Sequence, residues 1–131
     1  MAKTQTETTA PKEGKNILIV EDEKPLAHAL SLKLTHEGYR SQIAVNGADG
    51  QKEALTGTYD LILLDLIMPE VDGFAVLQAM NDKNITTPVI VLSNLGQDED
   101  RERALKLGAK AYFVKANTPI AEILTHVKKI L

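Results

Sequence analysis

The sequence contains no cysteine and no tryptophan among its 131 residues, and it has no long hydrophobic run. The lack of cysteine excludes disulfides, thiolate metal sites and thiol nucleophiles, and it fits a reducing compartment. The longest apolar runs have four or five residues, far fewer than the ~18 that a membrane-spanning helix needs. The first fifteen residues lack the apolar core of a signal peptide. We therefore expect a soluble, cytoplasmic protein that makes no contact with a membrane.

An excess of basic charge is also missing, because fifteen Lys and Arg stand against eighteen Asp and Glu, for a net charge of −3. A general nucleic-acid binder would carry a basic excess, so we expect no direct binding to nucleic acid. The length fits one domain of roughly 100–200 residues. The first segment, residues 1–15, is polar, rich in threonine and without periodicity, and this predicts a disordered tail before a domain at residues 16–131.

Short apolar runs alternate with helix-length segments from Asn16 onward. The runs lack strict polar alternation, as is typical of strands that are covered on both faces. They are Ile17–Val20, Ile43–Val45, Leu61–Leu64, Val89–Leu92 and Ala111–Val114. Five strand-then-helix units predict an α/β fold, a doubly wound five-stranded parallel sheet with five helices. By analogy with small folds of this class, we expect the strand order 2-1-3-4-5.

The segments between the runs carry apolar residues at three- and four-residue spacing, which predicts amphipathic helices. The second of these segments has only a weak stripe, which Ala48 and Leu55 anchor. Gly38, Gly57 and Gly108 follow the first, second and fourth segments. Glycine just past the last periodic residue is a common helix end, so we expect three helices to end there.

Polar side chains follow four of the five runs. They are Glu21 and Asp22 after the first, Asp65 after the third, Ser93 after the fourth and Lys115 after the fifth. Because the carboxyl ends of parallel strands meet at one edge of a sheet, we expect these side chains to converge. Carboxylates at such distances repel one another unless a cation lies between them, and oxygen ligands suit Mg²⁺. A carboxylate nucleophile with Mg²⁺ and a lysine has the groups that form an aspartyl phosphate.

Four segments in order and spacing resemble the receiver (phospho-acceptor) domain of bacterial two-component response regulators. They are ILIVED, VLSN, AYFVK and the run from Asp65 to Gly73, which reads DLIMPEVDG and resembles the phospho-acceptor loop. The resemblance extends from about Asn16 to Leu131. It implies a flavodoxin-like receiver fold and a phosphorelay signalling switch, not a turnover enzyme.

The resemblance implies that Asp65 accepts a phosphoryl group from a sensor histidine kinase or a phosphotransfer protein. It implies further that Asp22 binds Mg²⁺ directly, that Glu21 binds it through water, and that the backbone carbonyl of Ile67 completes the protein's share of the ligands. The output would pass to an unidentified protein target, with the chain acting as a monomer or as a phosphorylation-dependent homodimer.

Three further roles follow from the same resemblance. Lys115 would bind a phosphoryl oxygen, and Ser93 would sense the phosphate by moving toward Asp65. The space that Ser93 leaves would let Tyr112, the aromatic switch residue, turn inward. The protein would then have two conformations, and the charge added by phosphorylation would shift the equilibrium between them.

The sequence departs from the family pattern at two places near these residues. Ala116 follows the lysine where the family has proline, and Asn94 follows the serine where the family favours a small residue. Ile67 and Leu95 are apolar at positions that influence hydrolysis of the acyl phosphate in the family. Neither can orient an attacking water, so we expect slow self-dephosphorylation.

Two other functions stay open at this stage. The first is a pseudo-receiver, a binding module of the same fold that takes no phosphate. The second is a Mg²⁺-dependent phosphohydrolase with Asp65 as nucleophile, although Ile67 stands where that class typically has a second acid. The chain ends where the fifth helix is expected to end, which favours a single-domain receiver. A receiver cut from a longer regulator would look the same.

Overall fold

The computed structural model describes residues 14–131, in which strands and helices alternate. The strands are β2 (Asn16–Val20), β3 (Arg40–Ala44), β4 (Leu61–Leu64), β5 (Val89–Ser93) and β6 (Ala111–Val114). The helices are α1 (Lys24–His36), α2 (Gly47–Ala54), α3 (Gly73–Asp82), α4 (Asp98–Lys106) and α5 (Ile120–Ile130), with a short 3-10 helix η1 (Lys115–Asn117) before the last. The tail predicted at residues 1–15 lies almost wholly outside the described residues, so it stays a prediction.

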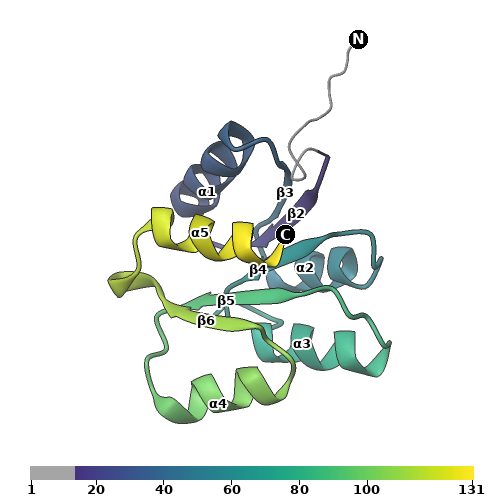
Figure 1. The fold of residues 1–131 in the computed structure, drawn as a ribbon. Helices are drawn as coiled ribbons and strands as arrows, with labels where there is room; N and C mark the ends of the chain where they lie inside the picture. The colour runs from purple at the N-terminus through teal and green to yellow at the C-terminus, as the bar shows by residue number, and fades with distance from the viewer. Residues whose placement is uncertain (1–13) are drawn as a thin grey trace.

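The five strands are all parallel, and their order across the sheet is β3-β2-β4-β5-β6. Counted along the chain this is the predicted order 2-1-3-4-5, and the doubly wound α/β fold is confirmed. Helices α1 and α5 cover one face of the sheet, and α2, α3 and α4 cover the other (Figure 1). Val20 pairs with Leu64, and Leu64 pairs with Val91. The residues that follow these strands therefore lie along one edge.

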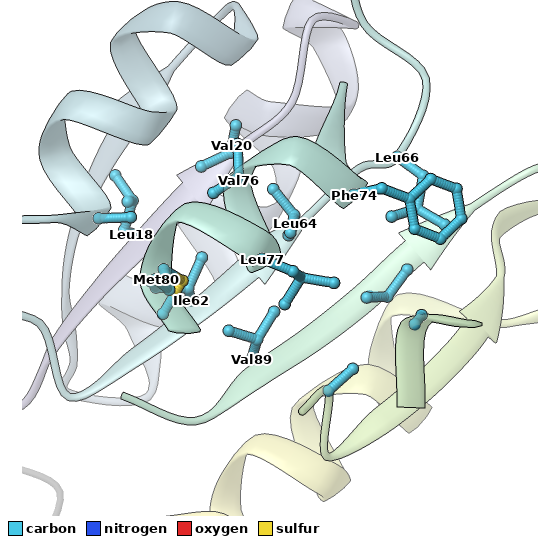
Figure 2. Close-up of a cluster of buried hydrophobic side chains, with 14 of the residues drawn as sticks. Leu18, Val20, Ile62, Leu64, Leu66, Phe74, Val76, Leu77, Met80 and Val89 are labelled. Carbon is cyan, nitrogen blue, oxygen red and sulfur yellow. The ribbon is translucent and has the colours of Figure 1, made fainter. Parts of the chain in front are cut away.

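Alternate residues of the strands supply two separate apolar cores. Leu18, Val20, Ile62 and Leu64 pack against Phe74, Val76, Leu77 and Met80 of α3, as Figure 2 shows. Ile17, Ile19, Leu61 and Leu63 pack on the opposite face against α1 and α5. Burying each such side chain contributes roughly 1.5–3 kcal/mol. This two-sided burial explains why the runs read as apolar throughout.

The second strand and the helix after it differ from the sequence prediction. The strand covers Arg40–Ala44 and not the apolar run Ile43–Val45, because β3 lies at the edge of the sheet and meets solvent. In α2, the predicted anchor Ala48 is exposed, whereas Gly50 is buried. A Cβ at Gly50 would lie 2.4 Å from Cγ1 of Val20. This helix therefore packs through its backbone, which an apolar stripe cannot reveal.

The predicted helix ends are confirmed, because Gly38, Gly57 and Gly108 follow α1, α2 and α4 within a few residues. In the part of the chain that the structure describes, no helix has the length and the apolar character needed to cross a bilayer.

Candidate functional site

The polar residues predicted at the strand ends lie together at the carboxyl edge of the sheet. Glu21 follows β2, Asp65 follows β4, Ser93 closes β5 and Lys115 follows β6. Among residues 14–131, the buried polar side chains are Glu21, Asp65 and Ser93, with exposed fractions of 2%, 4% and 0%. Burying a charged group costs several kcal/mol unless it is paired. The polar character of this edge therefore works against stability and calls for a functional explanation.

Lys115 supplies the positive charge that pairs with these carboxylates. Its Nζ lies 2.8 Å from Oε1 of Glu21, 3.2 Å from Oδ2 of Asp65 and 2.9 Å from Oε2 of Glu23. Burial lowers the pKa of Lys115, but the hydrogen bonds to Glu21 and Glu23 and the charge of Asp65 raise it well above its usual value. The lysine is therefore a permanent cation at the site. Its bond to Ala116 is trans, since the described residues contain no cis peptide bond.

Three carboxylates come close enough to share one cation. Glu21, Asp22 and Asp65 each offer an oxygen atom, and these atoms lie within 4.8 Å of one another. Burial raises the pKa of Glu21 to about 7, against the opposing hydrogen bond from Lys115. Burial also raises the pKa of Asp65, and the charge of Lys115 opposes that shift. The lysine alone therefore leaves negative charge at this edge incompletely compensated.

The donor set fits a magnesium ion. Carboxylate oxygens are the ligands that Mg²⁺ prefers, and it usually keeps several waters. Oε1 of Glu21 is buried and lies 2.8 Å from the Lys115 ammonium, but it accepts no hydrogen bond within residues 14–131, so it has capacity to accept from a metal-bound water. Asp22 is exposed and offers its oxygen from the solvent side. The amide of Ile67 donates to Oδ1 of Asp65 at 3.3 Å, so Ile67 lies beside this carboxylate. The ligand role of its carbonyl stays a prediction.

The loop after β4 is fixed by the start of α3. The amide of Gly73 donates to the carbonyl of Leu66 at 2.9 Å. A Cβ at Gly73 would lie only 2.4 Å from the carbonyl oxygen of Asp65, so the two backbones touch. Asp72 caps α3 by accepting the amide of Ala75 at 2.9 Å. The Asp72-Gly73 pair thus does more than form a turn, since it positions the backbone of Asp65.

Ser93 and Tyr112 lie next to one another across the neighbouring strands β5 and β6. The hydroxyl of Ser93 accepts the amide of Leu95 at 3.2 Å, and the hydroxyl of Tyr112 donates to the carbonyl of the same leucine. Tyr112 is buried, with 5% of its surface exposed. The structure therefore places the ring inward, and its predicted movement stays a prediction. Ser93 and Tyr112 therefore both contact the backbone of Leu95 in the loop after β5.

Sequence reasoning missed Glu23, which contacts Lys115. The signal was the unbroken acidic run from Glu21 to Glu23, in which the third residue was given no role. A cavity of about 200 Å³ opens beside Asp65. Its lining residues are Asp22, Glu23, Asp65, Ile67, Asn94 and Lys115. A larger cleft of about 580 Å³ lies between α3 and α4, away from these carboxylates. The chemistry of the residues, not the size of the cavity, identifies the candidate site.

Comparison with known proteins identifies the family of this chain. The family described as "Response regulator receiver domain" matches residues 17–128. The transcriptional regulatory protein CusR of Escherichia coli K12 is 40% identical over 115 residues, which are 88% of this chain and 50% of CusR. This chain therefore spans about half the length of the curated relatives that it matches.

Two solved structures of response regulators have folds similar to that of this chain. The receiver domain of the Francisella response regulator 1452 has a TM-score of 0.83 and 31% identity, over 89% of this chain and 96% of that one. The response regulator TrrA of Thermotoga maritima, solved in complex with Mg²⁺ and BeF, has a TM-score of 0.77 and 32% identity, over 89% of this chain and 99% of that one.

Proposed function

The chain belongs to the response regulator receiver family, and we propose that it is a phosphorylation-dependent switch whose acceptor is Asp65. Receiver domains of two-component response regulators accept a phosphoryl group from a histidine kinase, and this phosphorylation controls signalling. The observation that carries the assignment is the position of Asp65. Its carboxylate is 4% exposed, lies 3.2 Å from the Lys115 ammonium and shares an edge with two further carboxylates.

These residues can carry out phosphoryl transfer. An oxygen of Asp65 attacks the phosphorus of the donor, and the bond from phosphorus to the leaving nitrogen of a phosphohistidine breaks as the new bond forms. Lys115 stabilises the negative charge on the phosphoryl oxygens. A bound Mg²⁺ would supply further charge neutralisation, with Asp22 as a direct ligand, Glu21 as a ligand through water and Ile67 as a ligand through its carbonyl.

Ser93 and Tyr112 would report the charge change to the surface. A phosphoryl oxygen on Asp65 offers an acceptor for the Ser93 hydroxyl, which now accepts from the amide of Leu95. A rearrangement of Ser93 changes the loop that Tyr112 also holds through the carbonyl of Leu95. The surface formed by α4, β6 and α5 would then change shape.

The expected partners are a sensor histidine kinase or phosphotransfer protein as donor and a protein target as recipient. CusR is a transcriptional regulatory protein, and this chain matches only half of it. DNA is therefore the alternative downstream target. The whole chain has a net charge of −3 and therefore no basic excess, which favours output by protein contact.

Slow loss of the phosphoryl group is a further part of the proposal. Ile67 lines the cavity above Asp65 and is 53% exposed, and Leu95 lies two residues past Ser93. Neither side chain has a polar group that could orient an attacking water. We expect Ile67→Asn to shorten the lifetime of the phosphorylated state, measured by intact mass over time. An unchanged or longer lifetime would contradict this role.

The direct test is intact mass after incubation with acetyl phosphate and Mg²⁺. We expect a gain of one phosphoryl group in the wild type, and no gain in Asp65→Asn or without magnesium. Two further assays are independent of acetyl phosphate. A promiscuous kinase is a second phosphoryl donor, and beryllofluoride is a mimic of the phosphoryl group on the carboxylate. A lack of phosphorylation and of beryllofluoride binding in all three assays would contradict the proposed function and would favour a pseudo-receiver.

A further inference from the structure

The ammonium of Lys115 has all three of its N–H donors directed at carboxylates. A lysine side chain offers three donors and no acceptor. The hydrogen bonds run to Oε2 of Glu21 at 2.9 Å, to Oε2 of Glu23 at 2.9 Å and to Oδ2 of Asp65 at 3.2 Å. A phosphoryl oxygen on Asp65 needs one of these donors, so one of the present acceptors must give way.

Glu23 is the acceptor that can be replaced. Glu21 and Asp65 are buried, whereas the side chain of Glu23 is 57% exposed, so water can solvate its carboxylate after the contact breaks. Glu21 is also tied by the amide of Glu23, which donates to its Oε2 at 3.1 Å. Asp65 is the group that reacts.

The position of Glu23 in helix α1 supports the same assignment. It is the N-cap residue of this helix, yet its side chain makes no capping hydrogen bond. Its carboxylate turns to Lys115 instead, and it lines the cavity through which a donor reaches Asp65. Capping therefore does not account for the direction of this side chain, and the contact with Lys115 does.

We propose that Glu23 is a positioning residue that competes with the incoming phosphoryl group for Lys115. This inference rests on the proposed function. With acetyl phosphate, the bond from phosphorus to the acetyl oxygen breaks and acetate leaves with the electron pair, while the bond from phosphorus to an oxygen of Asp65 forms. The N–H of Lys115 that pointed at Glu23 passes to a phosphoryl oxygen. Glu23 thus slows donor binding and is released to solvent when the site is occupied.

The test compares Glu23→Gln with the wild type in the kinetics of phosphorylation by acetyl phosphate with Mg²⁺, followed by intact mass. Glutamine keeps the size of the side chain but removes the charge that competes for the ammonium. We expect the second-order rate constant to rise about two- to fivefold, the range of an exposed ion pair. The change should lie in the half-saturating donor concentration and not in the maximal rate. Glu102→Gln on α4 is the matched control, since it removes an exposed carboxylate away from this edge.

A second variant separates contact from charge. Glu23→Asp keeps the negative charge but loses the reach to Lys115, so it should behave like Glu23→Gln. A rate constant of Glu23→Gln equal to that of Glu102→Gln, or a Glu23→Asp variant equal to the wild type, would overturn the competition. Thermal unfolding of each variant checks that the fold is intact. If the wild type itself gains no phosphoryl group, the proposed function fails, and this inference fails with it.

Discussion

Helices α3 and α4 cover the same face of the sheet, but they are anchored very differently (Figure 1). Helix α3 buries five of its ten residues: Gly73, Phe74, Val76, Leu77 and Met80. Helix α4 buries only Ala104 among its nine. At roughly 1.5–3 kcal/mol for each large buried side chain, α3 is fixed to the core and α4 is held weakly.

The difference matches the positions of the two helices in the chain. Helix α3 follows the loop of Asp65 and fixes the backbone of this residue, the proposed acceptor. Helix α4 connects the strand that ends at Ser93 with the strand that carries Tyr112. Elements with few buried apolar contacts open at low free-energy cost. Under the proposed function, the firmly packed α3 would hold Asp65 in place for the chemistry, and the weakly packed α4 is suited to carry the response.

The largest expected effect comes from truncating one leucine on each helix. Leu77→Ala in α3 should lower the free energy of unfolding by about 2–5 kcal/mol, because Leu77 is 2% exposed and its removal leaves a cavity. Leu105→Ala in α4 should cost less than about 1 kcal/mol, since this residue is 39% exposed. Urea denaturation measures both. Equal losses would show that α4 is anchored as firmly as α3.

A smaller effect is expected from alanine at the glycine near the start of each helix. Gly73→Ala puts a Cβ 2.4 Å from the Asp65 carbonyl oxygen, and the required shift should cost about 1–3 kcal/mol. It should also slow phosphorylation of Asp65. A Cβ at Gly96, before α4, meets nothing within 4 Å. Gly96→Ala should therefore leave the rate of phosphorylation unchanged. Intact mass over time measures this rate in both variants. An equal loss of rate in the two variants would contradict the tight contact at Gly73.

The smallest expected effect concerns a contact between the two helices. The guanidinium carbon of Arg103 lies 4.1 Å from the ring centroid of Phe74, which ties α4 to α3. Arg103→Gln should lower stability by only about 0.5–1 kcal/mol, the range of an exposed cation–π contact. Amide hydrogen exchange should become faster in α4 and stay unchanged in α3. Lys106→Gln is the control, because it also removes one positive charge from α4. If amide exchange in α4 became equally fast in both variants, the contact between Arg103 and Phe74 would have no specific role.

The sheet and most of the site could be predicted because their signals are local. An unbroken apolar run marks a strand buried on both faces, and the polar residue after it marks the strand end. Glu21, Asp65, Ser93 and Lys115 were found in this way, although up to 94 residues separate those that touch. The parallel sheet brings these ends together without any further information from the sequence.

The remaining features depend on side-chain orientations and contacts that the sequence does not reveal. Whether the carboxylate of Glu23 caps its helix or reaches Lys115 is decided by the tertiary fold. The packing of α2 was hidden because Gly50 leaves no apolar side chain to count. The inward position of Tyr112 depends on a carbonyl in another loop. All three are contacts between elements distant in the chain.

The order of the strands also bears on how the protein is made. Of the five strands of this sheet, β2 is synthesised first and pairs with β3 and β4 inside the sheet, whereas β6, at one edge, is synthesised last. An incomplete nascent chain can therefore carry the acceptor Asp65 before it carries Lys115. Because contacts over long sequence separations form slowly, we expect the ammonium of Lys115 to reach Asp65 late in folding. We therefore expect no phosphorylation of Asp65 before β6 has paired with β5.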